Sequence, residues 1–249
     1  MSRRPSVVPR RPSVARRRAI EERTRRALPE NAVAFRRRLL AWYARHQRPL
    51  PWRKTRDPYA ILVSEIMLQQ TQVARVEAYW TRFLHRYPTV ESLAAASADA
   101  VHESWAGLGY YARARNLHAA AQAVVRDHDG AFPPEPEGLR RLPGIGRYTA
   151  AAVASIAFGA DVGTVDTNVS RVLGRVFRVR GTPKSAPRVR RTWDLVNALV
   201  PRRRAGDWNQ ALMDLGATIC TARVPRCPAC PVRIACRSRA RYAPMKPAL

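Results

Sequence analysis

From Val33 onward, hydrophobic residues recur three and four positions apart, the spacing that places side chains on one face of an α-helix. The segment "AVAFRRRLLAWYARH" puts Phe35, Leu39, Trp42 and Tyr43 on one such stripe. The same spacing continues through "YYARARNLHAAAQAVVRDHDG", "TNVSRVLGRVFRV", "RVRRTWDLVNALV" and "DWNQALMDLGATIC", without a convincing alternating strand pattern or a repeat. The pattern predicts an all-α protein of many short helices with short connections.

Capping residues and helix breakers indicate where several helices begin. Asp57 followed by Pro58 is an N-cap with proline at the first helical position, so a helix should start there. Ser97 and Asp99 are candidate caps inside "PTVESLAAASADAVHESWAGLG", which reads as two short helices. The segment "PEGLRRLPGIGRYTAAAVASIAFG" reads as two further helices joined by a tight turn.

One acidic residue interrupts the most apolar of these helices. In "AILVSEIMLQQTQV" the helical neighbours of Glu65 are Ile61, Leu62, Leu68 and Gln69, a face that solvates a carboxylate poorly. Burial there would raise the pKa of the carboxyl group and keep it protonated near neutral pH. For a lone glutamate, a position at the edge of the core with its head in water is the simpler interpretation. Glu65 therefore becomes a candidate acid only if partners exist elsewhere in the chain.

The charge of the chain indicates its partner. The formal net charge is +27, with 45 basic residues, nearly all arginine, against 18 acidic ones. A GC-rich genome favours arginine but does not explain the shortage of acids, so we expect nucleic acid as the partner and no membrane. No apolar run is long enough for a membrane span or a secretory signal. We expect a cytoplasmic, nucleoid-associated bacterial protein.

The N-terminal segment 1–31 is rich in Arg, Pro and Ser and lacks a sustained apolar period. We interpret it as a disordered basic arm that adds non-specific affinity for phosphates. Arg- and Ser-rich, acid-poor arms also serve as transit sequences, so this second interpretation stays open.

Four cysteines lie within 17 residues near the C-terminus. Cys220, Cys227, Cys230 and Cys236 are separated by six, two and five residues, and four thiolates so close can enclose one metal centre. A structural zinc site needs the same number of ligands. Zinc sites more often show two close pairs, and only Cys227 and Cys230 form one here, but the spacing leaves both centres open.

Two further motifs carry candidate chemistry. The turn "LPGIG", with Gly144 and Gly146, leaves amide groups unshielded at the start of a helix, where a DNA phosphate could bind. An ordinary helix connection also fits, although in so basic a chain the turn looks like the hairpin of helix-hairpin-helix proteins. In "VDTNVSRV", Asp166 is a candidate N-cap, a position that favours the ionised form. A neutral Glu65 and an anionic Asp166 would suit cleavage of a glycosidic bond.

Together these motifs resemble the endonuclease III-like superfamily of DNA glycosylases and, within it, the MutY-type adenine DNA glycosylases. The match runs from about Phe35 to Cys236 through "LPWR", "SEIMLQQTQV", "GLGYYARARNLH", "LPGIGRYTA", "VDTNVSRV", "NQALMDLGATIC" and the cysteine segment. It implies a two-lobed fold with DNA across the cleft. Residues 57–160 would form a six-helix barrel with the hairpin, and 32–56 with 161–240 a lobe holding a [4Fe–4S] cluster.

The resemblance also implies roles for individual residues. Glu65 matches the acid that protonates adenine N7, Asp166 the carboxylate that faces the oxocarbenium-like sugar, and Tyr148 and Asn168 the residues that orient this pair. Superfamily members that cut the strand carry a lysine in place of Tyr148, so we expect an intact abasic strand as the product. The four cysteines match the cluster ligands.

Other positions match residues that contact the DNA. Gln70 and Tyr110 match the wedge that fills the stack around a flipped nucleotide, and we expect one of Tyr110 and Tyr111 to pack in the core. The remaining assignments are Thr71 beside the opposite base, an adenine pocket of Trp52, Arg53, Leu68 and Gln210, and DNA contacts at Gln69, Gly144, Gly146 and Arg147.

Two departures from the family pattern affect what we expect. Thr167 stands where a glycine is common, which adds a side chain close to the scissile nucleotide. The chain ends thirteen residues after Cys236, whereas typical adenine glycosylases continue into a domain that helps recognise 8-oxoguanine. We therefore expect recognition of the oxidised base to be weaker, to fall to the catalytic lobes alone, or not to be the task.

Three functions fit the motifs. The first is a monomeric, monofunctional adenine glycosylase of base excision repair, acting on double-stranded DNA with adenine opposite guanine or 8-oxoguanine. The second is a thymine or uracil glycosylase for mismatches with guanine, although "LQQT" favours adenine because the thymine-directed relatives tend to carry arginines there. The third is a non-catalytic DNA-binding protein, which would need neither Glu65 nor Asp166.

Overall fold

The computed structural model describes residues 28–242, so most of the predicted basic arm (residues 1–27) lies outside the described residues. Within that range every regular element is helical and no strand occurs, which confirms the all-α prediction. The α-helices are α2 (Ala32–His46), α3 (Pro58–Met67), α4 (Val73–Arg86), α5 (Val90–Ala94), α6 (Ala98–Ser104), α7 (Ala112–His128), α8 (Pro136–Leu139), α9 (Arg147–Ala157), α10 (Thr167–Val176), α11 (Ala186–Leu199) and α12 (Ala205–Thr218). Short 3-10 turns are η1 (Pro51–Arg53), η2 (Cys227–Ala229), η3 (Arg233–Ala235) and η4 (Arg239–Tyr242).

Local capping explains where the helices begin. The Asp57 carboxylate accepts the backbone amides of Tyr59 at 3.0 Å and Ala60 at 3.2 Å, so α3 starts at Pro58 as predicted. Ser97 caps α6 by accepting the amide of Ala100 at 3.2 Å, so Ser97 is confirmed as a cap. The other candidate, Asp99, is not the cap, because it lies within the first turn of this helix. These caps satisfy amides that a helix leaves without an internal partner.

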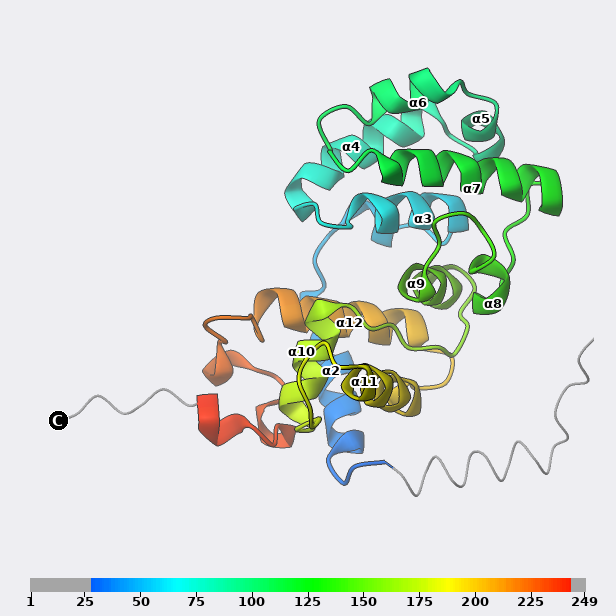
Figure 1. Ribbon diagram of the computed structural model, residues 1–249. Coiled ribbons are helices and arrows are strands. Elements are labelled where there is room, and N and C mark those ends of the chain that lie inside the picture. The colour runs from blue at the N-terminus through cyan, green and yellow to red at the C-terminus, as the bar shows by residue number, and fades with distance from the viewer. Residues whose placement is uncertain (1–27, 243–249) are drawn as a thin grey trace, which may run out of the picture.

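The helices pack around two hydrophobic cores, which form the upper and lower lobes in Figure 1. Helices α3 through α9 form the first core, which buries Trp105, Phe83 and Met67 almost completely. The second joins α2, α10, α11 and α12, with Trp208 and Phe35 meeting edge to face at 5.6 Å. Leu50 and Trp52, from the segment between α2 and α3, pack in the first core.

Helix α9 lies at the boundary between the lobes, where it contacts α3 and α12 (Figure 1). The buried Asn209 of α12 joins the two sides, because its amide group donates to the Ser155 hydroxyl and the Val162 carbonyl, both at 2.9 Å. Its oxygen accepts the amide of Thr164 at 3.1 Å. This polar group is fully bonded, so it fixes the two lobes in one arrangement.

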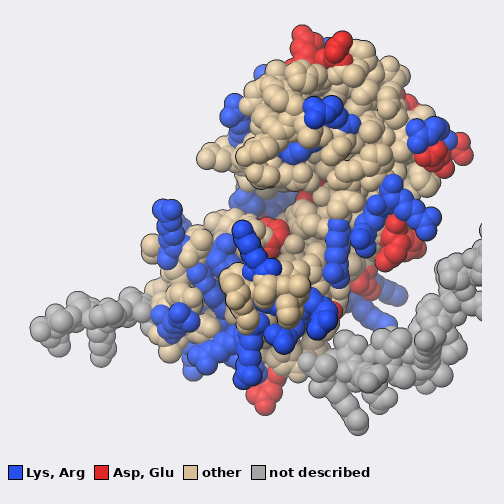
Figure 2. Space-filling model, viewed as in Figure 1, with Lys and Arg blue, Asp and Glu red and all other residues tan. Residues whose placement is uncertain are grey.

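The charge is distributed unevenly over the two lobes. Figure 2 shows the surface hollowed between them, with Lys and Arg side chains gathered mainly on the lower lobe. A basic surface beside a cleft attracts a polyanion. In the part of the chain that the structure describes, no helix is both long and apolar enough to cross a membrane.

Candidate active site

A pocket lies where the two lobes meet, and η1, α3, α9 and α12 all contribute to it. Six of the predicted site residues line it together: Trp52, Arg53, Glu65, Leu68, Tyr148 and Gln210. The other lining residues are Arg48, Leu50, Ile61, Ser64, Val73, Ile156 and Met213. The pocket is mostly apolar with a few convergent polar groups, the usual composition of a small-molecule or base site.

Glu65 is the most unusual group in this pocket. It lies on α3 with 6% of its surface exposed, and its Oε2 atom has no hydrogen-bond partner among the described residues. Burial raises the pKa of Glu65 to about 7, and the nearby Asp166 charge adds to the shift. A hydrogen bond from Tyr148 and the charge of Arg53 oppose it. The carboxyl group can therefore hold a proton at neutral pH.

Tyr148 stands on the first turn of α9 between the two candidate acids. Burial raises its pKa well above the ordinary 10.0, and the charges of Glu65 and Asp166 act in the same direction. Its hydroxyl group lies 3.8 Å from the Met213 sulfur, a weak acceptor, and also interacts with Glu65. The phenol thus stays neutral and can donate to the Glu65 carboxylate.

Asp166 caps the N-terminus of α10 as predicted. One carboxylate oxygen accepts the Val169 amide at 2.6 Å and the other accepts the Asn168 amide group at 3.1 Å. The capping position stabilises the ionised form of Asp166, but this stabilisation does not decide whether the pKa of Asp166 rises or falls. Burial raises the pKa of Asp166 above its ordinary value, although these two hydrogen bonds and the Arg171 charge oppose the rise.

A chain of hydrogen bonds connects Asp166 to the cysteine segment. Asn168 accepts a bond of 2.7 Å from Arg171, whose Nε donates to the Cys220 carbonyl at 2.8 Å. Gly216 allows α10 and α12 to approach, since a Cβ atom there would lie 2.6 Å from the Cβ atom of Asn168. Sequence reasoning identified neither Arg171 nor Gly216. Arg171 lies three positions after Asn168 on α10, a helical spacing that could have indicated the contact, whereas only the packing of α12 on α10 brings Gly216 to Asn168.

A second buried acid, Asp214 of α12, was also missed. Both Arg53 terminal nitrogens donate to its carboxylate, at 2.7 and 2.8 Å, and Arg48 adds a bond of 2.6 Å. Burial works against ionisation, but these arginines hold the pKa of Asp214 below its ordinary value. Arg53 therefore lines the pocket with its charge already paired. An acid inside the apolar "ALMDLG" was a signal of the same kind as Glu65.

The other three pocket residues are held by local contacts. Trp52 is 7% exposed and packs edge to face on Trp80 at 6.1 Å. Gln210 donates to the Gly206 carbonyl one turn earlier at 3.3 Å, and Leu68 is the C-cap residue of α3. These groups form the walls around the Glu65 carboxyl.

The predicted wedge residues lie outside this pocket on two loops. Gln70 and Tyr110 both have left-handed backbones, with φ of 56° and 50°, and Tyr110 is 58% exposed. Tyr111 is half-buried and stacks on His102 at 4.4 Å, so it is the member of the tyrosine pair that packs against the core. Gln69 and Thr71 flank Gln70 in the loop after α3.

The hairpin turn precedes α9. Gly144 has φ of 72°, and a Cβ atom there would come within 2.5 Å of the Asn116 side chain, so the turn needs glycine. Gly146 is the N-cap of α9, and no described atom lies within 4 Å of a Cβ added there. Arg147 does not extend freely, because its guanidinium stacks 3.9 Å above the Trp193 ring of α11.

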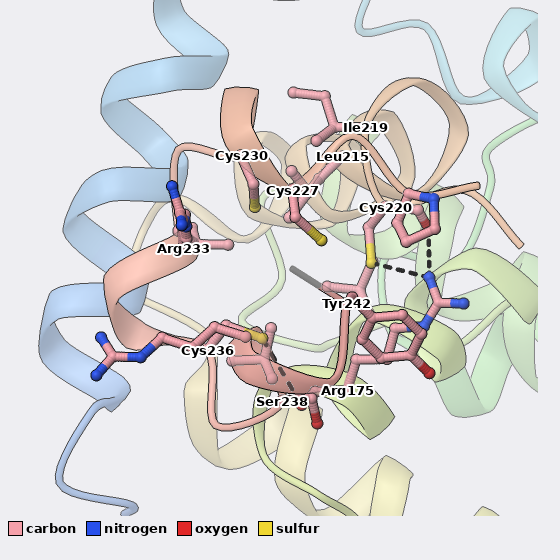
Figure 3. Close-up of a pocket in the computed structure, with 15 residues that line it drawn as sticks. Arg175, Leu215, Ile219, Cys220, Cys227, Cys230, Arg233, Cys236, Ser238 and Tyr242 are labelled. Atoms are coloured by element: carbon pink, nitrogen blue, oxygen red, sulfur yellow. Dashed lines mark hydrogen bonds between the residues drawn. The ribbon is translucent and has the colours of Figure 1, made fainter. Parts of the chain in front are cut away.

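The four cysteines surround one cavity between α10, α12 and the C-terminal turns, with their sulfurs facing a common space (Figure 3). Burial raises the pKa of Cys227, Cys230 and Cys236, that of Cys230 to about 11. Arg175 donates to the Cys220 sulfur at 3.5 Å and stacks 4.6 Å from the Tyr242 ring. In residues 28–242 no three His, Cys, Asp or Glu side chains converge closely enough to hold a single ion.

Comparisons with known proteins agree on one family. Residues 63–198 match the HhH-GPD superfamily base excision DNA repair protein profile. The chain is 49% identical over 220 residues to the adenine DNA glycosylase of Rattus norvegicus, covering 85% of this chain and 43% of that protein. It is 46% identical over 224 residues to the adenine DNA glycosylase of Mycobacterium tuberculosis, covering 87% and 73%. The chain thus spans less than half the length of the mammalian relative.

Solved structures agree with the sequence comparisons. A thermostable thymine-DNA glycosylase superposes with a TM-score of 0.78 at 32% identity, covering 85% of this chain and 98% of the other. A trapped endonuclease III–DNA covalent intermediate superposes with a TM-score of 0.66 at 26% identity, covering 75% and 86%. The two-lobed helical fold that the sequence predicted is therefore confirmed.

Proposed function

The chain belongs to the HhH-GPD superfamily of base excision DNA repair proteins, and we propose that it is a monofunctional glycosylase that removes adenine mispaired with guanine or 8-oxoguanine. The observation that carries this proposal is the buried Glu65 of the pocket between the lobes, with one carboxyl oxygen that has no partner among the described residues and a pKa of about 7, to which the nearby Asp166 charge contributes. Relatives at 46% to 49% identity that are adenine DNA glycosylases support the choice of base.

The pocket geometry supports an acid-assisted mechanism. Adenine departs poorly as an anion, so a proton donated from Glu65 to its ring makes the departure feasible, and a positioned acid contributes about 10²–10⁴-fold. The Asp166 carboxylate, held by Val169 and Asn168, stabilises the positive charge that develops on the sugar. Tyr148 keeps the Glu65 carboxyl oriented through its hydroxyl group.

The substrate in this proposal is double-stranded DNA, bound by one copy of the protein in the cleft between the lobes. The target base must leave the stack, at a cost of a few kcal/mol that is lowest for a mispaired base. The exposed Gln70 and Tyr110 would fill the gap that it leaves, with Thr71 beside the opposite base. The open backbone at Gly146 would receive a DNA phosphate.

Release of the base without strand cleavage follows from the residues at hand. A Schiff-base mechanism needs an amine nucleophile, and position 148 carries a phenol whose pKa is raised well above 10.0. No lysine lines the pocket in the described part of the chain, and Lys54 points to the surface at the end of η1. The product would be an abasic site in an intact strand.

A thymine or uracil glycosylase acting on mismatches with guanine is the second candidate. It is favoured by one observation, the TM-score of 0.78 with a thymine-DNA glycosylase of which this chain covers 98%. The higher identity to adenine DNA glycosylases argues for adenine, as does the pair Gln69 and Gln70.

We also propose that the four cysteines hold a [4Fe–4S] cluster. When bound, the cluster would cross-link the C-terminal segment to α10 and α12 and could exchange electrons. A zinc ion would require four sulfurs each about 2.3 Å from one centre. The four cysteine side chains line one shared cavity, which supports a single centre that all four would bind. Elemental analysis of the purified protein tests this: iron with equal inorganic sulfide supports it, and zinc alone refutes it.

The substrate proposal is tested by single-turnover base release from four duplexes, with alkali to reveal abasic sites. The target pairs are adenine opposite 8-oxoguanine, adenine opposite guanine, thymine opposite guanine and uracil opposite guanine. We expect release of adenine, slowed about 10²–10⁴-fold by Glu65→Gln. Release of thymine or uracil alone would transfer the protein to the second candidate. Binding without any release would favour a non-catalytic DNA-binding protein.

A further inference from the structure

We propose that Arg113 of α7 is a positioning residue that fastens the loop of Gln70 to the loop of Tyr110, so that both side chains enter the DNA stack as one unit. The two loops lie about 40 residues apart in the chain, residues 68–72 after α3 and 105–111 between α6 and α7. The consequence for catalysis rests on the proposed function, but the fastening itself is a property of the free protein.

The two terminal nitrogens of Arg113 together bond both loops: Nη1 donates to the end of α3 and the loop after it, and Nη2 donates to both loops. Nη1 donates to the carbonyls of Ile66 at 3.0 Å and Met67 at 2.8 Å, and to that of Gln69. Nη2 donates to the Thr71 hydroxyl at 3.1 Å and, on the second loop, to the carbonyls of Leu108 at 3.3 Å and Gly109 at 3.0 Å. One rigid group therefore holds both loops at a constant separation.

Gln70 and Tyr110 have backbone conformations that need the support of Arg113. Gln70 and Tyr110 both adopt left-handed backbones, which side chains other than glycine rarely adopt. Such conformations persist where the surroundings over-determine them. Arg113 bonds the carbonyls directly before them, those of Gln69 and Gly109, and its guanidinium lies 5.4 Å from the Tyr110 ring.

The chemistry of the contact requires arginine. Its guanidinium is planar, with donors that point in fixed directions, whereas a lysine ammonium is a single point of charge. Arg113 is 8% exposed and its Nε atom has no partner among the described residues, so burying this side chain is costly. A surface role would not require that burial, which indicates that the two-sided contact is its purpose.

Helix α7 also supports the third DNA-facing loop. Asn116, one turn after Arg113, lies directly beneath Gly144 of the hairpin turn. Residues three apart on a helix share a face. The same face of α7 thus carries both wedge loops and the hairpin, and Arg113 is the point where two of them are joined.

Amide hydrogen exchange on the DNA-free protein tests the fastening directly. Arg113→Lys keeps the charge but cannot bond both loops, and the matched control is Arg126→Lys, an exposed arginine at the far end of α7. We expect exchange in residues 68–72 and 106–110 to rise together by about tenfold in Arg113→Lys only, with the α3 core unchanged. Unchanged exchange in either loop of a folded variant would overturn the proposal.

A second measurement follows the DNA. A fluorescent adenine analogue beside the mispaired adenine reports unstacking, and Glu65→Gln in all samples slows base release so that the signal is read before turnover. We expect Arg113→Lys to reduce the unstacked signal at saturating protein, and in the active background to slow base release about 10–100-fold. A normal signal and rate would refute the coupling. Loosened loops in a protein that releases no adenine would refute only the proposed substrate.

Discussion

Glu65 and Asp214 are both buried carboxyl groups on apolar helices, α3 and α12, yet their surroundings differ completely. Asp214 has no exposed surface and accepts bonds from Arg48 and Arg53, which hold its pKa below the ordinary value. Glu65 is 6% exposed, has one oxygen without a partner among the described residues, and has a pKa of about 7. Burial alone therefore does not decide the state of an acid, because the partners decide it.

The difference separates two tasks at one pocket. Arg53 lines the pocket and lies near Glu65, but both of its terminal nitrogens are bound to Asp214. The pairing leaves Glu65 without a salt bridge, which would have ionised it. Asp214 thus stabilises the fold and pairs with the charge of Arg53, while Glu65 remains able to bind a proton.

Asp214→Asn should have the largest effect on stability. The substitution leaves the buried Arg53 without its counter-ion, and removal of one partner from a buried ion pair costs about 3–5 kcal/mol. Chemical denaturation at pH 7 measures the loss in the free energy of unfolding. Glu103→Gln, which removes an exposed ion pair with Arg86, is the matched control and should change it by less than about 1 kcal/mol. Equal small losses would mean that the Asp214 pair is not structural.

Glu65→Gln should have the opposite effect at alkaline pH. Between pH 4.5 and about 7 the folded protein binds a proton at Glu65 that the unfolded chain has lost, so wild-type stability falls as pH rises through this window. Gln cannot ionise, so the variant should be more stable than wild type at pH 8 by roughly 3 kcal/mol, with no such gain below pH 4.5.

The stability of the Asp214 pair should vary with pH in the other direction. Its pKa is lowered in the folded state, so its contribution is present above the ordinary 3.8 and is lost as the pH falls below it. Denaturation of wild type and Glu65→Gln across pH 3–9 distinguishes the carboxyl groups of Glu65 and Asp214. The loss of stability at acidic pH should occur in both proteins, and the loss as the pH approaches 7 should occur in wild type only. A constant difference between these proteins at all pH values would contradict a raised pKa of Glu65.

Local signals predicted much of this fold. Helix periodicity and the caps Asp57 and Ser97 were sufficient for the all-α class and for the starts of α3 and α6, since both depend on neighbours within a few residues. Glu65 was likewise visible as an acid in an apolar helix. The comparisons confirmed the two-lobed fold, and the roles of the site residues stay predictions.

Contacts between distant segments could not be predicted. The arginines of Asp214 lie 161 and 166 positions away, so the sequence does not distinguish a paired acid from an unpaired one. Arg171 reaches Cys220 across 49 positions for the same reason. The pKa of Asp166 was expected to be low from its capping position, but burial raises it. The local sequence predicts that Asp166 caps α10, but it does not predict that Asp166 is buried.

The rate of base release should fall with rising pH. If protonated Glu65 is the acid, its active fraction is lost as the pH passes the pKa of about 7, so the single-turnover rate should drop about tenfold per unit above that value. The measurement is a profile from pH 5.5 to 9 at saturating enzyme, with circular dichroism to show that the fold persists. A rate that rises with pH across this range would exclude Glu65 as the proton donor.

Tyr148→Phe should produce the smallest change, a shift in that profile. The Tyr148 hydroxyl lowers the pKa of Glu65 by a hydrogen bond, so its removal should move the alkaline midpoint upward, by less than the whole shift that burial produces. Tyr111→Phe, a half-buried tyrosine stacked on His102 outside the pocket, should leave the midpoint where it is. An unmoved midpoint in Tyr148→Phe would mean that the hydroxyl acts on Met213 alone, and a lower midpoint would mean that it favours the protonated acid. The direction of this shift therefore decides whether the Tyr148 hydroxyl group opposes the rise that burial produces in the pKa of Glu65 or adds to it.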